Sequence, residues 1–570
     1  MEPTEIQKKI IEYKGNVVVL ASPGSGKTFV LSEKIRRVLS DDSLLSYQGV
    51  IAISYTRKAS ANLKRRTIGN GMPTKNSFFG TIDNFCLTQI VIYYGHYVFG
   101  RPNKEVEVVG LDEINEQERK CFEWITKQHP NYNEIEDAQI KDLQKLFLKG
   151  YVLVDSLELL ALHIIKNSSA CRHYFQARFK YIFIDEYQDA DTYTNELFLS
   201  FVELGMTGVA VGDENQSIFG FANKSSIYLM SLKDREDFMM FPLRDNFRCS
   251  TPIINYSNRL LDSKSTVYET NQDGVYLIRV NGSEKQISSF IDNSIGEIKA
   301  KLGVDENKEI AILVKNERTQ KILDESLSTP HRLVRTTKLD LDLNPRSRLF
   351  ALLLRFYFDE RSPFLTVLDE YVDYDMLSTF AKQRLHQESK MIKSIPKESI
   401  DELVSHFKTI ADMILPRMQE GSSVTRLRNV LSNNKELESY TPILSDELQL
   451  MTLHKSKGLE FDIVFHLNMC EWEFPFKIVE NNDFDHPLYP NWEQELKLHY
   501  VGITRARKAC FLVRGTKRTN SQEILKMAMD SEFLRLNGIH TLRKDFFKFF
   551  AINLKRHDDR TKRNRSVSIR

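Results

Sequence analysis

Short runs of β-branched and aromatic residues, each bounded by turn-forming residues, recur along the chain in two blocks. The first block comprises residues 17–20, 50–54, 181–184, 209–211 and 238–241, and the second comprises 275–280, 310–314, 448–453, 463–467 and 511–513. Helical patterns separate most of these runs. Strands that alternate with helices predict parallel sheets covered by helices on both faces. The pattern therefore predicts an α/β fold with two parallel-sheet cores.

Two long stretches interrupt this alternation. Both carry mainly helical patterns, and each lies inside a block rather than between the blocks, which is typical of an insertion. We expect a first core at 1–86 and 178–245 with a helical insertion at 87–177, a second core at 246–344 and 441–520 with a reduced helical insertion at 345–440, and a C-terminal helix and basic tail at 521–570.

The composition is that of a soluble globular protein, with 41% hydrophobic and 27% charged residues. No apolar run approaches the roughly 20 residues of a membrane-spanning helix. The first residues also lack the pattern of a signal peptide. We therefore expect a cytoplasmic protein with no membrane partner. The six cysteines form no Cys-x-x-Cys pair, which argues against structural zinc and iron–sulfur clusters.

The net charge is only +2, so a nucleic-acid partner can be argued only from local basic clusters. One such cluster is Lys64-Arg65-Arg66, and another is the tail at 555–570. A solvated face or a disordered end explains such runs equally well. Charge alone leaves the question of nucleic acid open.

A candidate phosphate loop follows the first apolar run and precedes a helix. It reads Ala21-Ser22-Pro23-Gly24-Ser25-Gly26-Lys27-Thr28. Glycines let backbone N–H groups curl around a phosphate, and the helix N-terminus supplies positive potential. Lys27 is expected to neutralise phosphate charge and the Thr28 hydroxyl to bind Mg²⁺. Ala21 replaces the usual first glycine of this motif.

A second nucleotide signal is the apolar run at 181–184, which ends in Asp185 and Glu186. Carboxylates at the C-terminal edge of a parallel sheet face the ligand crevice. Asp185 is expected to hold Mg²⁺ and Glu186 to polarise the attacking water. A strand that simply ends in a polar turn is the alternative, and pairing with the phosphate loop disfavours it. No guanine-reading Asn-Lys-x-Asp follows a later strand, which argues against a GTPase.

Further motifs stand in order along the chain. They are Asp185-Glu186-Tyr187-Gln188-Asp189, Val211-Gly212-Asp213-Glu214-Asn215-Gln216, Asn246-Phe247-Arg248, Thr452-Leu453-His454-Lys455-Ser456-Lys457-Gly458-Leu459-Glu460 and Tyr500-Val501-Gly502-Ile503-Thr504-Arg505-Ala506-Arg507. In these motifs the chain resembles superfamily 1 helicases of the UvrD/Rep/PcrA type, from near residue 4 to near residue 515. The resemblance implies two RecA-like P-loop domains that clamp ATP and Mg²⁺ between them.

The same resemblance implies a role for individual residues in ATP binding and hydrolysis. Gln7 would read adenine, Phe247 would stack on it, and Glu460 would hydrogen-bond the ribose. Gln216 and Arg248 would contact the γ-phosphate, while Arg505 would act as an arginine finger. The expected ATP contacts of the first core are completed by Ser22, Gly24, Ser25, Gly26, Lys27, Thr28 and Phe29. Phe29 stands where relatives carry an arginine beside the adenine.

The resemblance also implies DNA contacts. The expected residues are Tyr55, Thr56, Arg57, Gly80, Thr81, Phe221, Thr452 and His454. Phe221 takes the place of a tryptophan on which a base stacks, with core packing as the alternative. Asp83 stands where many relatives carry histidine. The chain reads Phe221-Ala222-Asn223 where relatives have Trp-Arg-Gly, so one DNA-contacting arginine is missing.

Three hypotheses for function follow. The first is a 3′→5′ DNA helicase that acts on single-stranded or tailed duplex DNA. The second is a DNA-stimulated ATPase that activates a partner nuclease with little unwinding of its own. The third, a P-loop scaffold without catalysis, is disfavoured by the intact catalytic positions. The compact length is similar to the helicase-like subunit of the Gabija anti-phage system, which implies a separate ATPase–Toprim nuclease partner and an oligomer formed through it.

Overall fold

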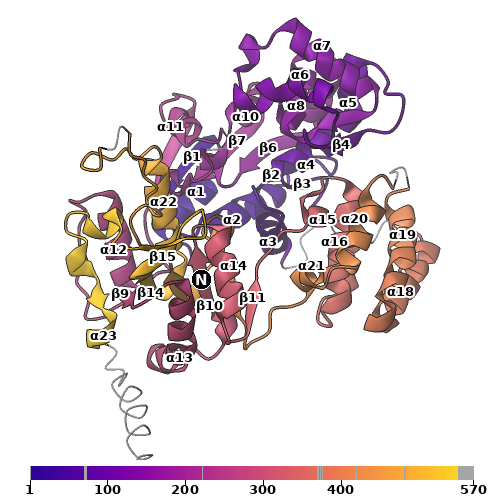
Figure 1. Cartoon of the computed structure of the whole chain (residues 1–570). Helices are drawn as coiled ribbons and strands as arrows, with labels where there is room; N and C mark the ends of the chain where they lie inside the picture. Colours follow the sequence, from indigo (N-terminus) through magenta and orange to yellow (C-terminus); the bar gives the residue numbers. More distant parts are fainter. Residues whose placement is uncertain are drawn as a thin grey trace, which may run out of the picture. The chain divides into compact units, whose positions relative to one another are not determined.

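The computed structural model describes residues 2–69, 74–220, 223–368, 371–372, 374, 377–416, 420–480 and 483–549. The chain forms two compact units (Figure 1). The first unit combines Met1–Phe247 with Arg335–Ile443, and the second combines Arg248–Val334 with Leu444–Arg570. Each unit is therefore built from two separate stretches of the chain.

The first unit is centred on a six-stranded sheet in which all neighbouring strands are parallel (Figure 1). Its strands in spatial order are β3 (Phe78–Gly80), β2 (Gly49–Ile53), β6 (Phe179–Ile184), β7 (Thr207–Gly212), β1 (Asn16–Ala21) and β8 (Phe238–Leu243). Val18 packs into one hydrophobic cluster, while Val17 and Val19 pack into another. Burial on both faces explains why β1 is a continuous apolar run rather than an alternating one.

Helices cover both faces of this sheet. One cluster includes side chains from α1 (Glu5–Glu12), α2 (Lys27–Leu39) and α3 (Arg57–Ile68). The opposite cluster includes side chains from α4 (Ile82–Phe85), α8 (Leu157–Asn167), α10 (Thr192–Glu203) and α11 (Ile227–Lys233). The stretch at 87–177 is mainly helical, and the side chains of its helix α8 pack in the same hydrophobic cluster as the sheet. Its other elements are η1 (Cys86–Val91), α5 (Ile92–Phe99), β4 (Glu107–Val109), α6 (Glu116–Lys127), η2 (Tyr132–Glu134), α7 (Asp137–Leu148), β5 (Tyr151–Leu153), η3 (Val154–Ser156) and α9 (Ser169–Arg178).

The stretch at 335–443 is helical and has a hydrophobic core of its own. Its elements are α15 (Lys338–Leu341), α16 (Pro345–Phe358), α17 (Phe364–Leu368), α18 (Thr379–Ser394), η9 (Lys397–Glu402), α19 (Leu403–Ile414), α20 (Ser423–Leu431), α21 (Asn434–Leu437) and η10 (Glu438–Tyr440). In sequence it interrupts the second sheet, but it groups with the first unit. Arg57 donates to the Asp342 carbonyl at 2.7 Å, and Arg426 pairs with Glu113 at 2.8 Å.

The second unit contains a seven-stranded parallel sheet. Its strands in spatial order are β11 (His331–Leu333), β12 (Leu448–Thr452), β10 (Ile310–Val314), β13 (Phe461–His466), β14 (Ala506–Gly515), β9 (Val275–Val280) and β17 (Lys544–Asp545). The accompanying elements are α12 (Thr251–Leu261), α13 (Glu284–Leu302), η7 (Asn307–Glu309), α14 (Glu317–Ser326), η11 (His454–Ser456), α22 (Trp492–Ile503), β15 (Lys517–Thr519), β16 (Leu525–Met527), η12 (Glu532–Arg535), η13 (His540–Leu542) and α23 (Phe546–Phe549).

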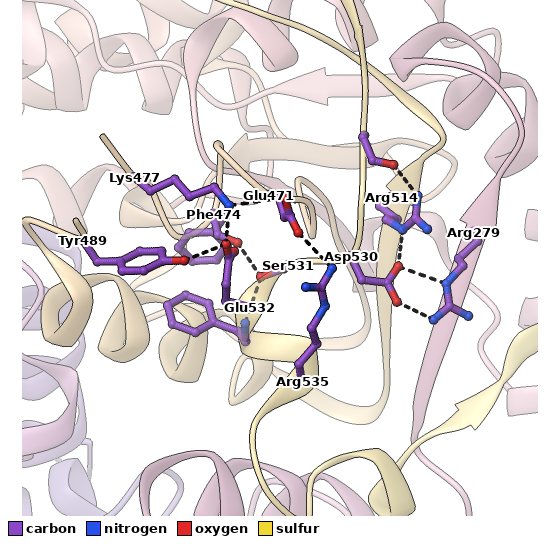
Figure 2. A network of polar contacts seen from close by, with 12 residues as sticks. Arg279, Glu471, Phe474, Lys477, Tyr489, Arg514, Asp530, Ser531, Glu532 and Arg535 are labelled. Atoms are coloured by element: carbon purple, nitrogen blue, oxygen red, sulfur yellow. Dashed lines mark hydrogen bonds and ion pairs between the residues drawn. The ribbon is translucent and has the colours of Figure 1, made fainter. Parts of the chain in front are cut away.

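A polar network fastens the segment after β14 to the second sheet (Figure 2). Asp530 accepts hydrogen bonds from Arg279 of β9 at 2.6 and 3.1 Å, and it also pairs with Arg514 of β14. Burial alone would raise the pKa of Asp530, but the two arginines bring it down to about 2. Nearby, Lys477 pairs with Glu471 at 3.2 Å and with Glu532 at 2.8 Å. These contacts fix the segment after β14, which contains few strands, to the rest of the second unit.

The two parallel sheets and their helical insertions confirm the predicted α/β fold with two RecA-like cores. Beyond residue 520 the described chain forms short strands, turns and the four-residue α23, while the basic tail lies outside the described residues. Within the described part, none of the helices has the length and hydrophobicity needed to cross a bilayer. All six cysteines are free thiols, and five of them are buried.

Candidate functional site

The loop between β1 and α2 has the backbone conformation that a phosphate loop needs. Gly24 and Gly26 have φ values of 69° and 86°, in the left-handed region that favours glycine. Gly26 is the N-cap of α2, and Lys27 and Thr28 are the first residues of that helix. Ser25 is buried, and its hydroxyl has no hydrogen-bond partner among the described residues. A helix N-terminus with a spare buried hydroxyl fits an anionic phosphate.

Gln7 of α1 packs against this loop. Its side-chain amide donates to the Ser25 carbonyl at 3.2 Å, and its amide oxygen accepts from the backbone N–H of Thr4 at 3.0 Å. A Cβ added to Gly26 would come within 2.9 Å of the Gln7 amide nitrogen. The loop and Gln7 therefore fit closely only with glycine at position 26.

The two other expected adenine contacts of the first unit also lie beside the loop. Phe29 is the third residue of α2, and its half-buried ring packs against the core of α1 and α2. The backbone N–H of Phe247 donates to the Gly24 carbonyl at 2.9 Å, while 53% of Phe247 is exposed. Ser22 is fixed by its N–H, which donates to the Leu243 carbonyl at 2.9 Å. The structure thus brings Gln7, Phe29 and Phe247, the expected adenine contacts of this unit, beside the phosphate loop.

Asp185 and Glu186 follow β6, at the sheet edge where β1 also ends. The backbone N–H of Asp185 donates to the Ile53 carbonyl at 2.9 Å, and its side chain is buried. Glu186 has a φ of 57°, and its carboxylate lies 3.5 Å from the Lys27 ammonium. A non-glycine residue in this region costs about 1–3 kcal/mol, and such strain gathers at functional sites.

Gln188 links the Asp185–Glu186 turn to the next strand. Its side-chain nitrogen donates to Glu186 at 2.5 Å, and its oxygen accepts from the backbone N–H of Asp213 at 2.9 Å. Gln216 donates to the Asp213 carboxylate at 2.7 Å. Burial raises the pKa of Asp213, and the Lys27 charge opposes that shift. One chain of polar contacts therefore runs from Lys27 to Gln216.

Two family models match the chain around these residues. The model described as an AAA domain matches residues 5–222, which include the phosphate loop, Glu186 and Gln216. The model described as the UvrD-like helicase C-terminal domain matches residues 360–515. The chain therefore resembles UvrD-type helicases in both of its sequence blocks. It is therefore an ATP-dependent enzyme, and the predicted resemblance is confirmed.

Similar proteins of this type cover nearly the same length. The Gabija protein GajB of Bacillus cereus is 24% identical over 539 residues, which span 90% of this chain and 95% of that protein. The ATP-dependent DNA helicase PcrA of Bacillus subtilis is 22% identical over 621 residues, or 90% of this chain and 82% of PcrA. PcrA of Staphylococcus aureus gives similar values, with 22% identity and 83% of its length covered.

In the second unit of this helicase, the later motifs lie close together. Arg248 pairs with Glu460 at 2.7 Å. The backbone N–H of Ser250 donates to the Arg507 carbonyl at 2.8 Å, and that of Phe461 donates to the Arg505 carbonyl at 2.9 Å. Three motifs that are far apart in sequence thus form one cluster within this unit.

Arg505 is enclosed within the second unit. Only 1% of it is exposed, and its guanidinium donates to the Val501 carbonyl at 3.1 Å, the Leu459 carbonyl at 3.2 Å and the Thr504 hydroxyl at 3.3 Å. These contacts join the end of α22 to Leu459, within the motif at 452–460. Arg505 therefore has a structural role here.

The expected DNA contacts of the first unit come from two adjacent turns. Thr56 caps α3 by accepting the Ala59 N–H at 3.1 Å, and Thr81 caps α4 by accepting the Asn84 N–H at 3.4 Å. The backbone N–H of Ser54 donates to the Gly80 carbonyl at 3.1 Å, which fixes the two turns to each other. Phe221, the expected stacking residue, and Ala222 lie outside the described residues.

Tyr55 and Asp83 have surroundings that the sequence did not indicate. The Tyr55 hydroxyl is buried, and burial raises its pKa well above 10. Burial raises the pKa of Glu158 of α8 well above its usual value, and the charges of Asp83 and Asp191 raise it further. Asp83 is thus close enough to the helical insertion to act on one of its buried carboxyl groups.

Thr452 and His454, the expected DNA contacts of the second unit, stand at the end of β12 and in η11. Thr452 pairs with Val314 in the sheet register. Burial lowers the pKa of His454, and the charges of Lys315 and Lys457 lower it further. These effects favour the neutral form of the His454 ring.

Mg²⁺ fits the residues at the head of the first sheet. The described residues include no group of three or more His, Cys, Asp or Glu side chains that could hold a metal. Mg²⁺ usually keeps several waters and uses only one or two protein ligands together with substrate phosphates. Thr28, at the start of α2, and buried Asp185 suit that sparse arrangement. Gln188 and Asp213 were missing from the predicted site although both stand inside the quoted motifs.

Proposed function

We propose that this helicase-type enzyme is a DNA translocase that hydrolyses ATP while gripping single-stranded DNA. The observation that carries the proposal is the continuous polar chain from Lys27 through Glu186 and Gln188 to Asp213 and Gln216. Through these contacts, a phosphate bound at the loop would shift Asp213 and Gln216, in the motif at 211–216. The DNA-gripping turns follow neighbouring strands of the same sheet, so both ligands act on one rigid framework.

In this proposal each residue has a defined task. Lys27 neutralises phosphate charge, and the Glu186 carboxylate accepts a proton from the attacking water. Gln188 holds that carboxylate in place. Thr28 and Asp185 would hold Mg²⁺, which screens the charge of the phosphates when bound. The family resemblance assigns Arg248 and Arg505 to the same reaction, and it also implies 3′→5′ movement.

A second candidate function is supported by the similarity to the Gabija protein over 95% of that protein's length. In this reading the chain is a DNA-stimulated ATPase in anti-phage defence, and it activates an ATPase–Toprim nuclease subunit with little unwinding of its own. Both functions use the same ATP site. They differ in whether ATP turnover separates strands.

Strand displacement decides between the two functions. Duplexes with a 3′ tail, a 5′ tail or no tail are incubated with enzyme and ATP, and ATP turnover on a short single strand is measured in parallel. The translocase proposal predicts displacement of the 3′-tailed duplex alone and none by Glu186→Gln. ATP turnover without strand displacement on any tailed duplex would favour the sensor function. ATP turnover that DNA does not stimulate would reject both functions.

A further inference from the structure

The motif that begins at Val211 continues to residue 223, and it lacks the arginine that relatives place after their stacking residue. Here the sequence reads Phe221-Ala222-Asn223, and Lys224 follows directly. The Lys224 ammonium lies 4.7 Å from the centre of the Tyr55 ring. A cation therefore stands beside one of the expected DNA-contacting residues, two positions after the missing arginine.

The backbone around Lys224 is fixed from two sides. Asn223 has a φ of 58°, and its side chain donates to the Thr126 carbonyl at 3.2 Å. The backbone N–H of Ser225 donates to the Ala190 carbonyl at 3.1 Å. These contacts hold Lys224 between the helical insertion and the turn after the Asp185–Glu186 motif, so its position is set by the fold.

Several acidic groups lie near Tyr55. The charges of Asp191, Asp189 and Glu158 all act on the Tyr55 hydroxyl, and the Lys224 charge acts in turn on Glu158. Unbalanced carboxylates would repel a DNA phosphate. Arg57, the nearest arginine in sequence, donates to the Asp342 carbonyl. Lys224 is thus well placed to offset the acidic groups near this turn.

We propose that Lys224 binds a backbone phosphate of single-stranded DNA beside Tyr55, in the role that relatives give to the missing arginine. The proposal rests on the proposed function, because it requires that DNA passes over the Tyr55–Arg57 turn. A lysine suits this task, since a phosphate contact needs a charge and no base-specific geometry.

The test compares Lys224→Met with wild type in binding to a fluorescent oligothymidylate at several salt concentrations. Methionine keeps an unbranched side chain of similar size but removes the charge. We expect about fivefold weaker binding at low salt, and a salt slope that is shallower by about 0.7, the value for one single-strand phosphate contact. Lys224→Arg should restore both quantities. Lys233→Met, on the exposed end of α11, is the matched control and should match wild type.

The outcomes separate this inference from the proposed function. If wild type binds the oligonucleotide and Lys224→Met binds it with equal affinity and slope, the phosphate contact is rejected and the translocase proposal stands. If wild type shows no binding, both fail. A loss of thermal stability in Lys224→Met with unchanged affinity and slope would show that Lys224 only packs on Tyr55, which also overturns the contact.

Discussion

The ammonium of Lys27 lies 3.5 Å from the Glu186 carboxylate, which joins the phosphate loop to the acidic end of β6. Both side chains are largely shielded, with 12% and 20% of their surfaces exposed. A largely buried ammonium needs a negative partner, and a bound phosphate can take over that role from Glu186. Exchange of partners at Lys27 would then leave the Glu186 carboxylate available to a water molecule.

Replacing Lys27 or Glu186 should abolish ATP turnover by different routes. Lys27→Ala removes the charge that holds the phosphates, so we expect loss of both ATP binding and hydrolysis. Glu186→Gln keeps the size and the left-handed backbone but cannot accept a proton, so turnover should fall by at least about 10²-fold while ATP still binds. Fluorescent ATP binding and phosphate release with single-stranded DNA measure the two effects. Unchanged hydrolysis by Glu186→Gln would refute its assignment as the base.

Gln188 should affect the rate of hydrolysis more than the affinity for ATP. Gln188→Met has nearly the same volume but cannot orient Glu186, so we expect kcat to fall by about 10- to 100-fold with little change in KM for ATP. The buried Asp213 N–H would lose its partner, at a cost of about 1–3 kcal/mol in urea unfolding. Gln176→Met, on the exposed face of α9, is the control. A rise in KM at constant kcat would contradict this role.

The two motif arginines of the second unit, Arg248 and Arg505, should respond differently to removal. Arg248 pairs with Glu460, which is 46% exposed, so Arg248→Ala should change the free energy of unfolding by less than about 1 kcal/mol. Arg505→Ala leaves three acceptors without their donor and should cost about 2–4 kcal/mol. We expect both variants to lose turnover by about 10³-fold or more. Equal unfolding curves for the two variants would argue against the structural role of Arg505.

The sequence allowed the two sheets to be predicted because their central strands are buried on both faces and form unmistakable apolar runs. The edge strands β3 and β11 were missed, since three residues are too few to show a period. The grouping of residues 335–443 with the first unit was also not foreseeable. It depends on contacts such as Arg57 with Asp342, which no local pattern encodes.

At the candidate site, residue identities were easier to predict than their conformations. Parallel topology places Lys27 and Glu186 at the same sheet edge, so their proximity follows from the fold. The left-handed backbone of Glu186 has no sequence signal, because glutamate rarely adopts it. The burial of Arg505 was equally hidden, since its motif is compatible with an exposed or an enclosed guanidinium. Side-chain partners, rather than motif membership, decide such questions.

Glu158 should make the stability of the first unit depend on pH. Burial and the Asp83 and Asp191 charges raise its pKa above the usual 4.5, so the folded protein holds this proton more tightly than the unfolded chain. The resulting stabilisation is complete below pH 4.5 and is lost as the pH rises through the folded-state pKa. Glu158→Gln mimics the protonated carboxyl, because the amide is uncharged and of similar size. As the pH rises above 4.5, we therefore expect the free energy of unfolding to fall less for the variant than for wild type.

Urea unfolding at a series of pH values from about 5 to 9 measures this difference as a linkage slope. Glu123→Gln provides the contrast, because hydrogen bonding to Lys127 lowers the pKa of Glu123 and places its contribution on the acid side. That variant should follow wild type across the neutral and alkaline range. If Glu158→Gln instead tracks wild type at every pH, Glu158 holds no extra proton in the folded protein, and burial of this carboxyl group does not make stability depend on pH.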